Sequence, residues 1–417
     1  MCWRGLLCSP FFSLCLVCSS RSSPINDILF DNIIGREGAV MKVTVLQTNL
    51  AHGLGIVSRA VSPRTTLPVL ANILVATDEG RLRLSATNLE MGITCWIGAK
   101  IEEEGSTTVP ARTFADLVNT LPGEQVALTL DPTTQVLNVR SGTSTNDLKC
   151  IDAQEFPPLP VPDMEGALQI NVVDFKEMIQ QVVFAASVDE ARPVLMGVLV
   201  KVNGDQITLA AADGFRLSVR TATLSSPFAK PVSAIIPARA LAELARIASD
   251  GDQMIQMVFP KERGQVVFRL KDIELSSQLI DGTFPDYEQI IPRGYKSRTL
   301  VSTASLLKAC KQAEIFAREG SNVARLNIKA GSSEMEPSEV EISAQSEETG
   351  SNETIVEATV DGIGLLIAFN VKFLREVLEV IKTPNVAIET TAPNAPGVIR
   401  PVGDDSFLHV IMPMHIA

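Results

Sequence analysis

The stretch VPARTFADL, residues 109–117, returns 127 positions later as IPARALAEL, residues 236–244. Both copies share Pro-Ala-Arg and close on an acidic residue followed by Leu. In the first copy Phe114, Leu117 and Val118 follow the i, i+3, i+4 spacing of one helix face. A more divergent copy, FNVKFLREVLEVI, lies at residues 369–381 and keeps this spacing. We therefore predict three equivalent amphipathic helices in a chain built from repeats.

Other features recur at the same period. An earlier amphipathic helix is predicted in each copy behind a residue that commonly caps helices, namely Asn49, Asp174 or Ser305. Between the helices lie alternating runs typical of strands with one buried face: RLRLSA (81–86), QITLAA (206–211), QVVFRL (265–270) and LNIKA (326–330). Pro-rich segments, EFPPLP (155–160) and TFPDYEQIIP (283–292), close the first two copies. We predict an α+β chain of three similar domains, 41–160, 167–292 and 298–417, each with two helices packed on antiparallel sheets.

The composition is that of a globular chain, with 417 residues of which 46% are hydrophobic. The formal net charge of −12 argues, taken alone, against a nucleic-acid-binding protein. The excess is concentrated, however, because residues 334–357 contain eight Glu and no Lys or Arg. The remainder is close to balanced, so a basic face on one side of the molecule remains compatible with the sequence.

The first 40 residues differ in character from the rest. They resemble a short signal peptide, with Arg4 followed by an apolar run. Alternatively, translation begins at Met41, where MKVTVLQTNL opens a strand-then-helix pattern, and we prefer this interpretation. Residues 1–40 are then an N-terminal extension outside the fold. Cys95, Cys150 and Cys310 are scattered singly, as expected for small buried side chains in a reducing, cytoplasmic compartment.

The sequence offers no constellation of residues for catalysis. Its three His residues lack metal-ligand spacing, and neither a GxxxxGK[ST] phosphate loop nor a GxSxG nucleophile elbow is present. Asp213-Gly214 and Asp281-Gly282 are typical of turns. We therefore expect no catalytic residue, metal or cofactor. An enzyme with a dispersed active site and a protein-only scaffold remain as alternatives.

The repeated helices also share a basic position. Arg112, Arg239 and Lys372 occupy equivalent sites, and on a helical wheel they point away from the apolar face. Such bases can neutralise DNA phosphates without reading sequence. They can equally pair with Asp116, Glu243 and Glu376, which lie one turn further along. Periodicity alone leaves both interpretations open.

Residues 41–417 closely resemble one family, the bacterial sliding clamp or beta subunit of DNA polymerase III. The resemblance rests on MKVTV at the start of this region, RTTLPVLANIL (64–74), ATNLEMGI (86–93), TVPAR (108–112), DEARPVLMGV (189–198), AADGFRLS (211–218), DGTFPDY (281–287) and VIMPM (410–414). It implies three clamp-type domains per chain and two chains closed into a six-domain ring, with helices lining the hole. It also implies a non-enzymatic processivity factor that encircles double-stranded DNA and tethers the replicative polymerase catalytic subunit.

The resemblance further implies sites and partners. DNA contacts fall on Arg64, Arg112 and a loop of the second domain, SVDEARPVL (187–195), with Arg192 as its candidate; Arg239 is the counterpart of Arg112. Some relatives carry Gln and aromatic residues in this loop, where this chain has Asp189, Pro193 and Val194. The expected dimer contacts are Leu148, Ile315 and Phe316. Besides a second copy, the implied partners are DNA, the polymerase, the clamp loader and other proteins with a clamp-binding motif, but no membrane.

An apolar pocket between the second and third domains is implied as the site for these motifs. Its residues are Leu195, Gly214, Phe215, Arg216, Leu217, Pro285, Gln289, Ile290, Val410, Ile411, Met412, Pro413 and Met414. Met and branched aliphatic side chains make an adaptable surface suited to several peptides. Gln289 stands where some relatives have Arg, so the preferred peptide is expected to differ.

Overall fold

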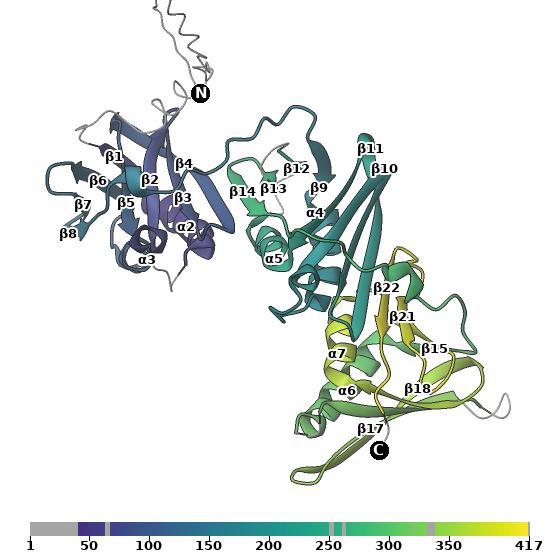
Figure 1. The fold of residues 1–417 in the computed structure, drawn as a ribbon. Coiled ribbons are helices and arrows are strands. Elements are labelled where there is room, and N and C mark those ends of the chain that lie inside the picture. The colour runs from purple at the N-terminus through teal and green to yellow at the C-terminus, as the bar shows by residue number, and fades with distance from the viewer. Residues whose placement is uncertain are drawn as a thin grey trace, which may run out of the picture.

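The computed structural model describes residues 41–62, 67–249, 254–260, 264–319, 321–331 and 338–415. The N-terminal extension and Arg64 lie outside these residues. Three domains follow one another in a curved row, with the helices along its inner side and the strands toward its outer side (Figure 1). The predicted α+β fold of three similar domains is confirmed.

The first domain has two α-helices and two groups of strands in its described residues. Its first half contains β1 (Lys42–Leu46), α2 (Gln47–Val57), β2 (Asn72–Asp78), β3 (Arg81–Thr87) and β4 (Met91–Glu103). Its second half repeats that order with β5 (Ser106–Pro110), α3 (Ala111–Thr120), β6 (Gln125–Asp131), β7 (Val136–Ser141) and β8 (Ser144–Lys149). The last strand, β8, pairs with β7.

In the second domain two long strands lie between the two α-helices, where the first domain has the four shorter strands β2 to β5. The elements are β9 (Leu168–Asn171), α4 (Val172–Val182), β10 (Gly197–Ala212), β11 (Arg216–Pro237), α5 (Ala238–Ile247), β12 (Met254–Val258), β13 (Gln265–Arg269) and β14 (Ile273–Gln278). The long strands β10 and β11 pair along their length, with irregular register on either side of Gly204. Gly204 has a φ of 61°, which glycine adopts without steric cost.

The third domain returns to the order of the first. It contains β15 (Ser297–Ser302), α6 (Thr303–Ala317), β16 (Val323–Lys329), β17 (Ser338–Ser346), β18 (Gly350–Gly362), β19 (Leu365–Asn370), α7 (Val371–Val380), β20 (Asn385–Thr390), β21 (Gly397–Pro401) and β22 (Phe407–Ile411). Much of the Glu-rich stretch therefore forms the β17–β18 hairpin. Glu339 and Glu341 bind Lys329 at 2.9 and 2.8 Å, and these hydrogen-bonded contacts raise the pKa of the lysine.

The repeated amphipathic helices form as predicted. Phe114 on α3, Leu241 on α5 and Leu374 on α7 are each fully buried, whereas Arg112 at the exposed face retains 96% of its side-chain exposure. Burying a large apolar side chain contributes about 1.5–3 kcal/mol relative to leaving it exposed. The apolar stripe thus fixes which face of each helix meets the sheets.

The predicted helix caps are wrong by one turn. The first helix of each copy begins after Leu46, Asn171 or Ser302, and Asn49, Asp174 and Ser305 are each the third helical residue. Asn171 Oδ1 accepts from the backbone N–H of Val173, at 2.9 Å. Polar residues are common both at the cap and in the first turn of a helix. The residue type alone therefore does not show which of the two positions it occupies.

Strand pairing joins consecutive domains in the same way twice. β14 of the second domain pairs antiparallel with the start of β4, and β22 of the third pairs antiparallel with the start of β11. Just beyond each ladder a further backbone bond forms, from Trp96 N–H to Asp272 O at 2.9 Å and from Thr221 N–H to Ser406 O at 2.8 Å. The outer sheets are therefore continuous across both joints.

A buried histidine lies in the second of these joints. His409 on β22 is fully buried, with Nδ1 2.6 Å from Ser218 Oγ and its ring 5.4 Å from that of Phe184. Burial, and secondarily the charge of Arg216, hold the pKa of His409 well below its usual value of 6.5. Below about pH 6.5 the unfolded chain therefore protonates this ring, whereas the folded protein keeps it neutral.

We predict that His409 makes stability depend on pH. Its contribution is complete above about pH 6.5 and declines as the pH falls, because only the unfolded chain then takes up the proton. The free energy of unfolding of the wild type relative to H409Q should fall by up to about 2 kcal/mol between pH 6.5 and 5. Urea unfolding at several pH values measures this, with H52Q at an exposed helix position as control. A difference that does not change with pH would contradict the assignment.

Candidate partner pocket and nucleic-acid interface

An apolar surface forms at the joint between the second and third domains. Leu217 on β11 pairs with Val410 on β22, and the side chains of both enter one cluster. The linker between these domains adds Phe284 and Tyr287, and Leu195 packs against the edge. The other members of the cluster are Val194, Leu199, Ala210, Ala212, Val219, Ile235, Ile280, Ile291, Val398 and Leu408. Two domains and their linker therefore build a single apolar floor.

Exposed apolar side chains border this floor. Phe215 is 61% exposed and Met412 39%, and the N–H of Met412 donates to the carbonyl of Phe215 at 2.8 Å. Gly214, with a φ of 94°, forms the turn before Phe215, and a Cβ atom there would lie 3.0 Å from Nη1 of Arg192. Arg192 thus lies beside the pocket turn, where it also pairs with Asp189 at 3.0 Å.

The C-terminal segment divides between the pocket and the domain core. Ile411 is buried in the core of the third domain, on the opposite face of β22 from Val410. Met414 donates its N–H to Ala368 O at 2.8 Å, which extends the sheet beside β19. Met414 and Pro413 are half-buried. The side chain of Ile411 is therefore not available to a ligand at the pocket.

The linker presents the remaining predicted residues at the surface. Pro285 and Gln289 are exposed, and Gln289 Nε2 donates to Asp286 Oδ2 at 2.8 Å. Ile290 is 42% exposed. Sequence reasoning missed Phe284, Tyr287 and Val398 as parts of the floor. The two aromatic residues within DGTFPDY were the available signal for Phe284 and Tyr287, whereas β21, whose apolar residues are buried on both faces, gave none for Val398.

Arg216 differs from the other pocket candidates because its side chain leaves the pocket. Only 8% of it is exposed, and it pairs with Asp213 at 3.0 Å and with Glu376 on α7. Its guanidinium also donates to Phe184 O at 2.6 Å and stacks on the ring of Phe373 at 4.2 Å. The hydrogen-bonding capacity of Arg216 is thus directed to the joint between the domains.

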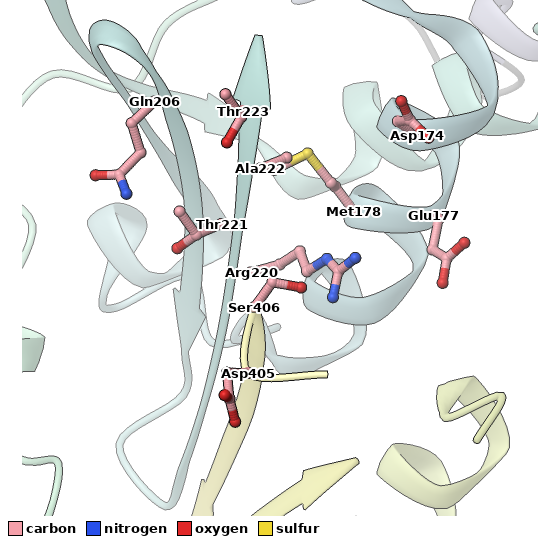
Figure 2. Close-up of a pocket in the computed structure, with 10 residues that line it drawn as sticks. All are labelled: Asp174, Glu177, Met178, Gln206, Arg220, Thr221, Ala222, Thr223, Asp405 and Ser406. Carbon is pink, nitrogen blue, oxygen red and sulfur yellow. The ribbon is translucent and has the colours of Figure 1, made fainter. Parts of the chain in front are cut away.

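A polar hollow of about 600 Å³ lies at the same joint (Figure 2). Helix α4 contributes Asp174, Glu177 and Met178 on one side, and β11 contributes residues 220–223 on the other. Asp405 and Ser406, just before β22, close its lower end. Beside it, Arg220 of the second domain pairs with Asp404 of the third at 2.6 Å. The hollow is thus bounded by an ion-paired contact between domains.

Basic side chains on the inner helices fall into two groups. Arg112 is 96% exposed and lies 3.8 Å from Asp116, which is itself 75% exposed. Arg239 is exposed and makes no ion pair within the described ranges, whereas Lys372 is 4.0 Å from Glu376. Exposed pairs of this kind contribute little stability, so these bases remain open to a polyanion.

Other bases on this side are held by protein groups. Arg59 pairs with Glu243 of the second domain at 3.0 Å, and Lys311 pairs with Glu379 at 3.0 Å. Lys176 donates to Ala248 O at 3.0 Å. Of the two interpretations left open for this helix, pairing of Glu243 with Arg239 is not observed: the Glu243 carboxylate, in a side chain only 12% exposed, binds Arg59 and Arg246. These contacts tie helices and domains together.

The predicted dimer residues lie at the two ends of the row. Leu148 is half-buried on β8, in the first domain. Ile315 on α6 is 59% exposed, and Phe316 beside it packs partly against the core of the third domain. Within one chain these two sets are not brought together.

Other features of the described residues bear on metal binding, membrane association and thiol reactivity. No group of three or more His, Cys, Asp or Glu side chains among them could hold a metal ion, and none of their helices is long and apolar enough to cross a membrane. Cys95 and Cys310 are buried free thiols, and burial raises the pKa of each to about 12. Such thiols are poor nucleophiles at neutral pH.

The repeated domains and the pocket at their second joint define the class of protein as a three-domain clamp. Family models for the N-terminal, central and C-terminal domains of the DNA polymerase III beta subunit match residues 41–160, 169–286 and 288–415. The Beta sliding clamp of Bacillus subtilis (strain 168) is 33% identical over 386 residues, covering 90% of this chain and 99% of its own length.

Solved structures agree. The DNA polymerase sliding clamp from Bacillus subtilis superposes with a TM-score of 0.84 at 30% identity, and that from Pseudomonas aeruginosa with 0.81 at 28%. Each similarity covers 90% of this chain and the whole of the other. The chain belongs to the DNA polymerase III beta subunit family, the bacterial sliding clamps. As a member it is a polymerase processivity factor and not an enzyme.

The floor and the rim of the pocket should respond differently to truncation. Leu217 is 2% exposed, so L217A should lower the free energy of unfolding by about 2–5 kcal/mol through lost burial and an unfilled cavity. F215A removes a side chain that is 61% exposed and should change stability by less than about 0.5 kcal/mol. Urea unfolding of the two variants tests this. Equal losses would contradict the distinction between floor and rim.

Proposed function

We propose that two copies of this chain close head-to-tail into a six-domain ring that encircles duplex DNA and tethers the replicative polymerase. The observation that carries this proposal is the repeated joint. Strands β14 and β22, each the last of its domain, pair with β4 and β11 of the preceding domain. The equivalent last strand of the first domain, β8, and the start of β18 in the third have no such partner within the described chain.

The positions at these two free edges correspond residue by residue to the joints already formed. Ile355 is the sixth residue of β18, as Trp96 is of β4 and Thr221 of β11. Thr143 directly precedes β8, as Asp272 precedes β14 and Ser406 precedes β22. By this equivalence the N–H of Ile355 donates to the carbonyl of Thr143 of the partner subunit. The exposed state of Ile355, at 55%, supports the assignment.

A second hollow supports the same arrangement. It has a volume of about 510 Å³ and lies between α6 and β18, lined by residues that include Lys308, Gln312 and Ile355. Its counterpart at α4 and β11 is closed at one end by Asp405 and Ser406 of the following domain (Figure 2). In the ring, the segment before β8 of the partner would take this place, with Leu148 nearby and Ile315 and Phe316 on the adjoining helix.

The proposed joint between chains would lack an ion pair that the second joint within the chain has, and that the first, with Cys95 at the equivalent position of β4, also lacks. Thr354 is the fifth residue of β18, where β11 has Arg220, which binds Asp404. A noncovalent joint without this pair is a reasonable place for a clamp loader to open the ring. We include the clamp loader among the partners on this basis and on family membership.

The inner surface supports sequence-independent DNA contact. Arg112, Arg239 and Lys372 occupy the same position at the start of α3, α5 and α7, and these helices follow the inner side of the row (Figure 1). Such basic side chains neutralise phosphates without reading the nucleotide sequence, and sequence-independent contact suits a ring that slides along DNA. We retain Arg64 as a proposed contact from the family resemblance. Arg192 is better supported as a pocket residue, because it lies against Gly214.

The apolar floor and its exposed rim support binding of short motifs from the polymerase, the clamp loader and other clamp-binding proteins. The rim offers Phe215, Ile290 and Met412, and the floor lies directly beneath.

We also propose a cytoplasmic protein, with domains at 41–160, 167–292 and 298–417. The three family matches and the linkers around Phe156 and Phe284 support these limits.

The topological tether has a direct test. Clamps loaded onto nicked circular DNA should stay bound until the circle is cut, and then slide off the unblocked ends. R112A/R239A should load more weakly and reduce the dependence of DNA association on salt, by a slope of about two for two lost phosphate contacts. K230A, which removes an exposed base from strand β11, is the matched control. Retention of the wild type on linear, unblocked DNA would sink the ring proposal.

The pocket is tested separately. M412E/M414E should weaken binding of a fluorescein-labelled peptide carrying the clamp-binding motif of the cell's own polymerase at least tenfold, because it buries charge against an apolar floor. Fluorescence anisotropy measures the affinity, and gel filtration should still show the wild-type mass. V173E, at an exposed apolar site on α4, should bind as the wild type does. Normal binding by M412E/M414E would remove the pocket assignment.

A further inference from the structure

Arg216 stands between the pocket and the inner surface of the row. Its neighbours in the sequence are Phe215, at the rim and in the turn before β11, and Leu217, on β11 and in the floor. Its own side chain turns the other way and reaches Glu376 on α7. We propose that Arg216 is a positioning residue for the peptide pocket, which acts through Glu376 on the inner helix rather than by touching the peptide. This inference rests on the pocket proposed above.

The contacts of the guanidinium leave it little capacity for a ligand. Nε donates to Asp213 Oδ2 at 3.0 Å, Nη1 to Glu376, and Nη2 to the carbonyl of Phe184 at 2.6 Å. The ring of Phe373 lies 4.2 Å from its central carbon. With 8% of the side chain exposed, a peptide could reach these donors only by displacing protein partners.

The same guanidinium fixes the turn that presents the rim. Asp213 Oδ1 accepts from the backbone N–H groups of Phe215 and Arg216, at 2.8 and 3.0 Å, while its Oδ2 is held by Arg216 Nε. The carbonyl of Phe215 in turn accepts from Met412 N–H. Two rim residues therefore depend on a carboxylate that Arg216 holds in place.

Glu376 connects this arrangement to the inner helices. Its Oε2 receives Arg216, while Oε1 lies 3.7 Å from Arg375 and 4.0 Å from Lys372. Arg375 also pairs with Glu314 on α6, at 2.7 Å. Removing the charge of Glu376 would leave a largely buried guanidinium without its carboxylate on α7. Asp213 would then be the remaining carboxylate partner of Arg216, so we expect the guanidinium to shift toward it and displace the turn that carries the rim.

The equivalent acids of the other domains have different partners. Asp116 lies 3.8 Å from Arg112, and Glu243 binds Arg59 and Arg246. Within the described residues, Glu376 is thus the one of the three that reaches a pocket strand. On α7 itself, Glu379 binds Lys311 and Arg375 but not Arg216, which makes it a matched control.

The test measures peptide affinity after a change that does not touch the pocket. With the labelled polymerase-motif peptide, E376Q should bind about 5- to 20-fold more weakly than the wild type, and E379Q within about twofold of it. E376D keeps the charge and should recover part of the loss. R216K should resemble E376Q, because lysine cannot reproduce the fork and the stacking of arginine.

A double-mutant cycle separates positioning from general destabilisation. R216K/E376Q should bind within about twofold of the weaker single variant, because both changes break the same link. Thermal unfolding identifies any variant that is not folded at the assay temperature, and E376D then supplies the comparison. If E376Q and E376D both bind the peptide as tightly as the wild type does, the inference is overturned. Failure of the wild type itself to bind would instead overturn the proposed pocket, so the two outcomes are distinguishable.

Discussion

Backbone pairing between neighbouring domains is the interaction on which the rest of the molecule depends. Each joint within the chain pairs the last strand of one domain with the start of a long strand in the domain before it, as β14 with β4 and β22 with β11. Main-chain hydrogen bonds set the angle between domains without requiring any particular side chain. The curvature of the row, the alignment of the inner helices and the position of the pocket all follow from this repeated pairing.

The second joint has acquired features that the first lacks. At the first, Gly92 faces Leu159 of the linker, which fills the space a side chain would need. At the second, Leu217 stands at the equivalent strand position and helps to form an apolar floor with an exposed rim. The same architecture thus fills one joint with its own linker and leaves exposed apolar side chains at the other. The two joints therefore differ in the side chains that they carry at equivalent strand positions.

Much of this organisation could be predicted from the sequence. Periodicity predicts the three repeated helices, the alternating strands and the exposed Arg112, because the spacing of apolar residues indicates which face of an element is buried. The contact of Arg216 with Glu376 could not be predicted, since the two residues lie 160 positions apart and Glu376 has the sequence pattern of a surface acid on its helix. The ion pair of Glu243 could not be predicted for the same reason, because its partner Arg59 belongs to another domain. Contacts across joints depend on the pairing of domains, which local patterns do not encode.

The central claim is that the two free edges, β8 and the start of β18, complete a ring between two chains. Native mass measured by light scattering tests it most directly. The wild type should have twice the mass of one chain, and I290D, at the pocket rim, should be unchanged. A variant with Asp at both Ile315 and Ile355, which are exposed on α6 and β18, should fall to the mass of a single chain. A single-chain wild type, or a double variant that keeps the mass of two chains, would contradict the account.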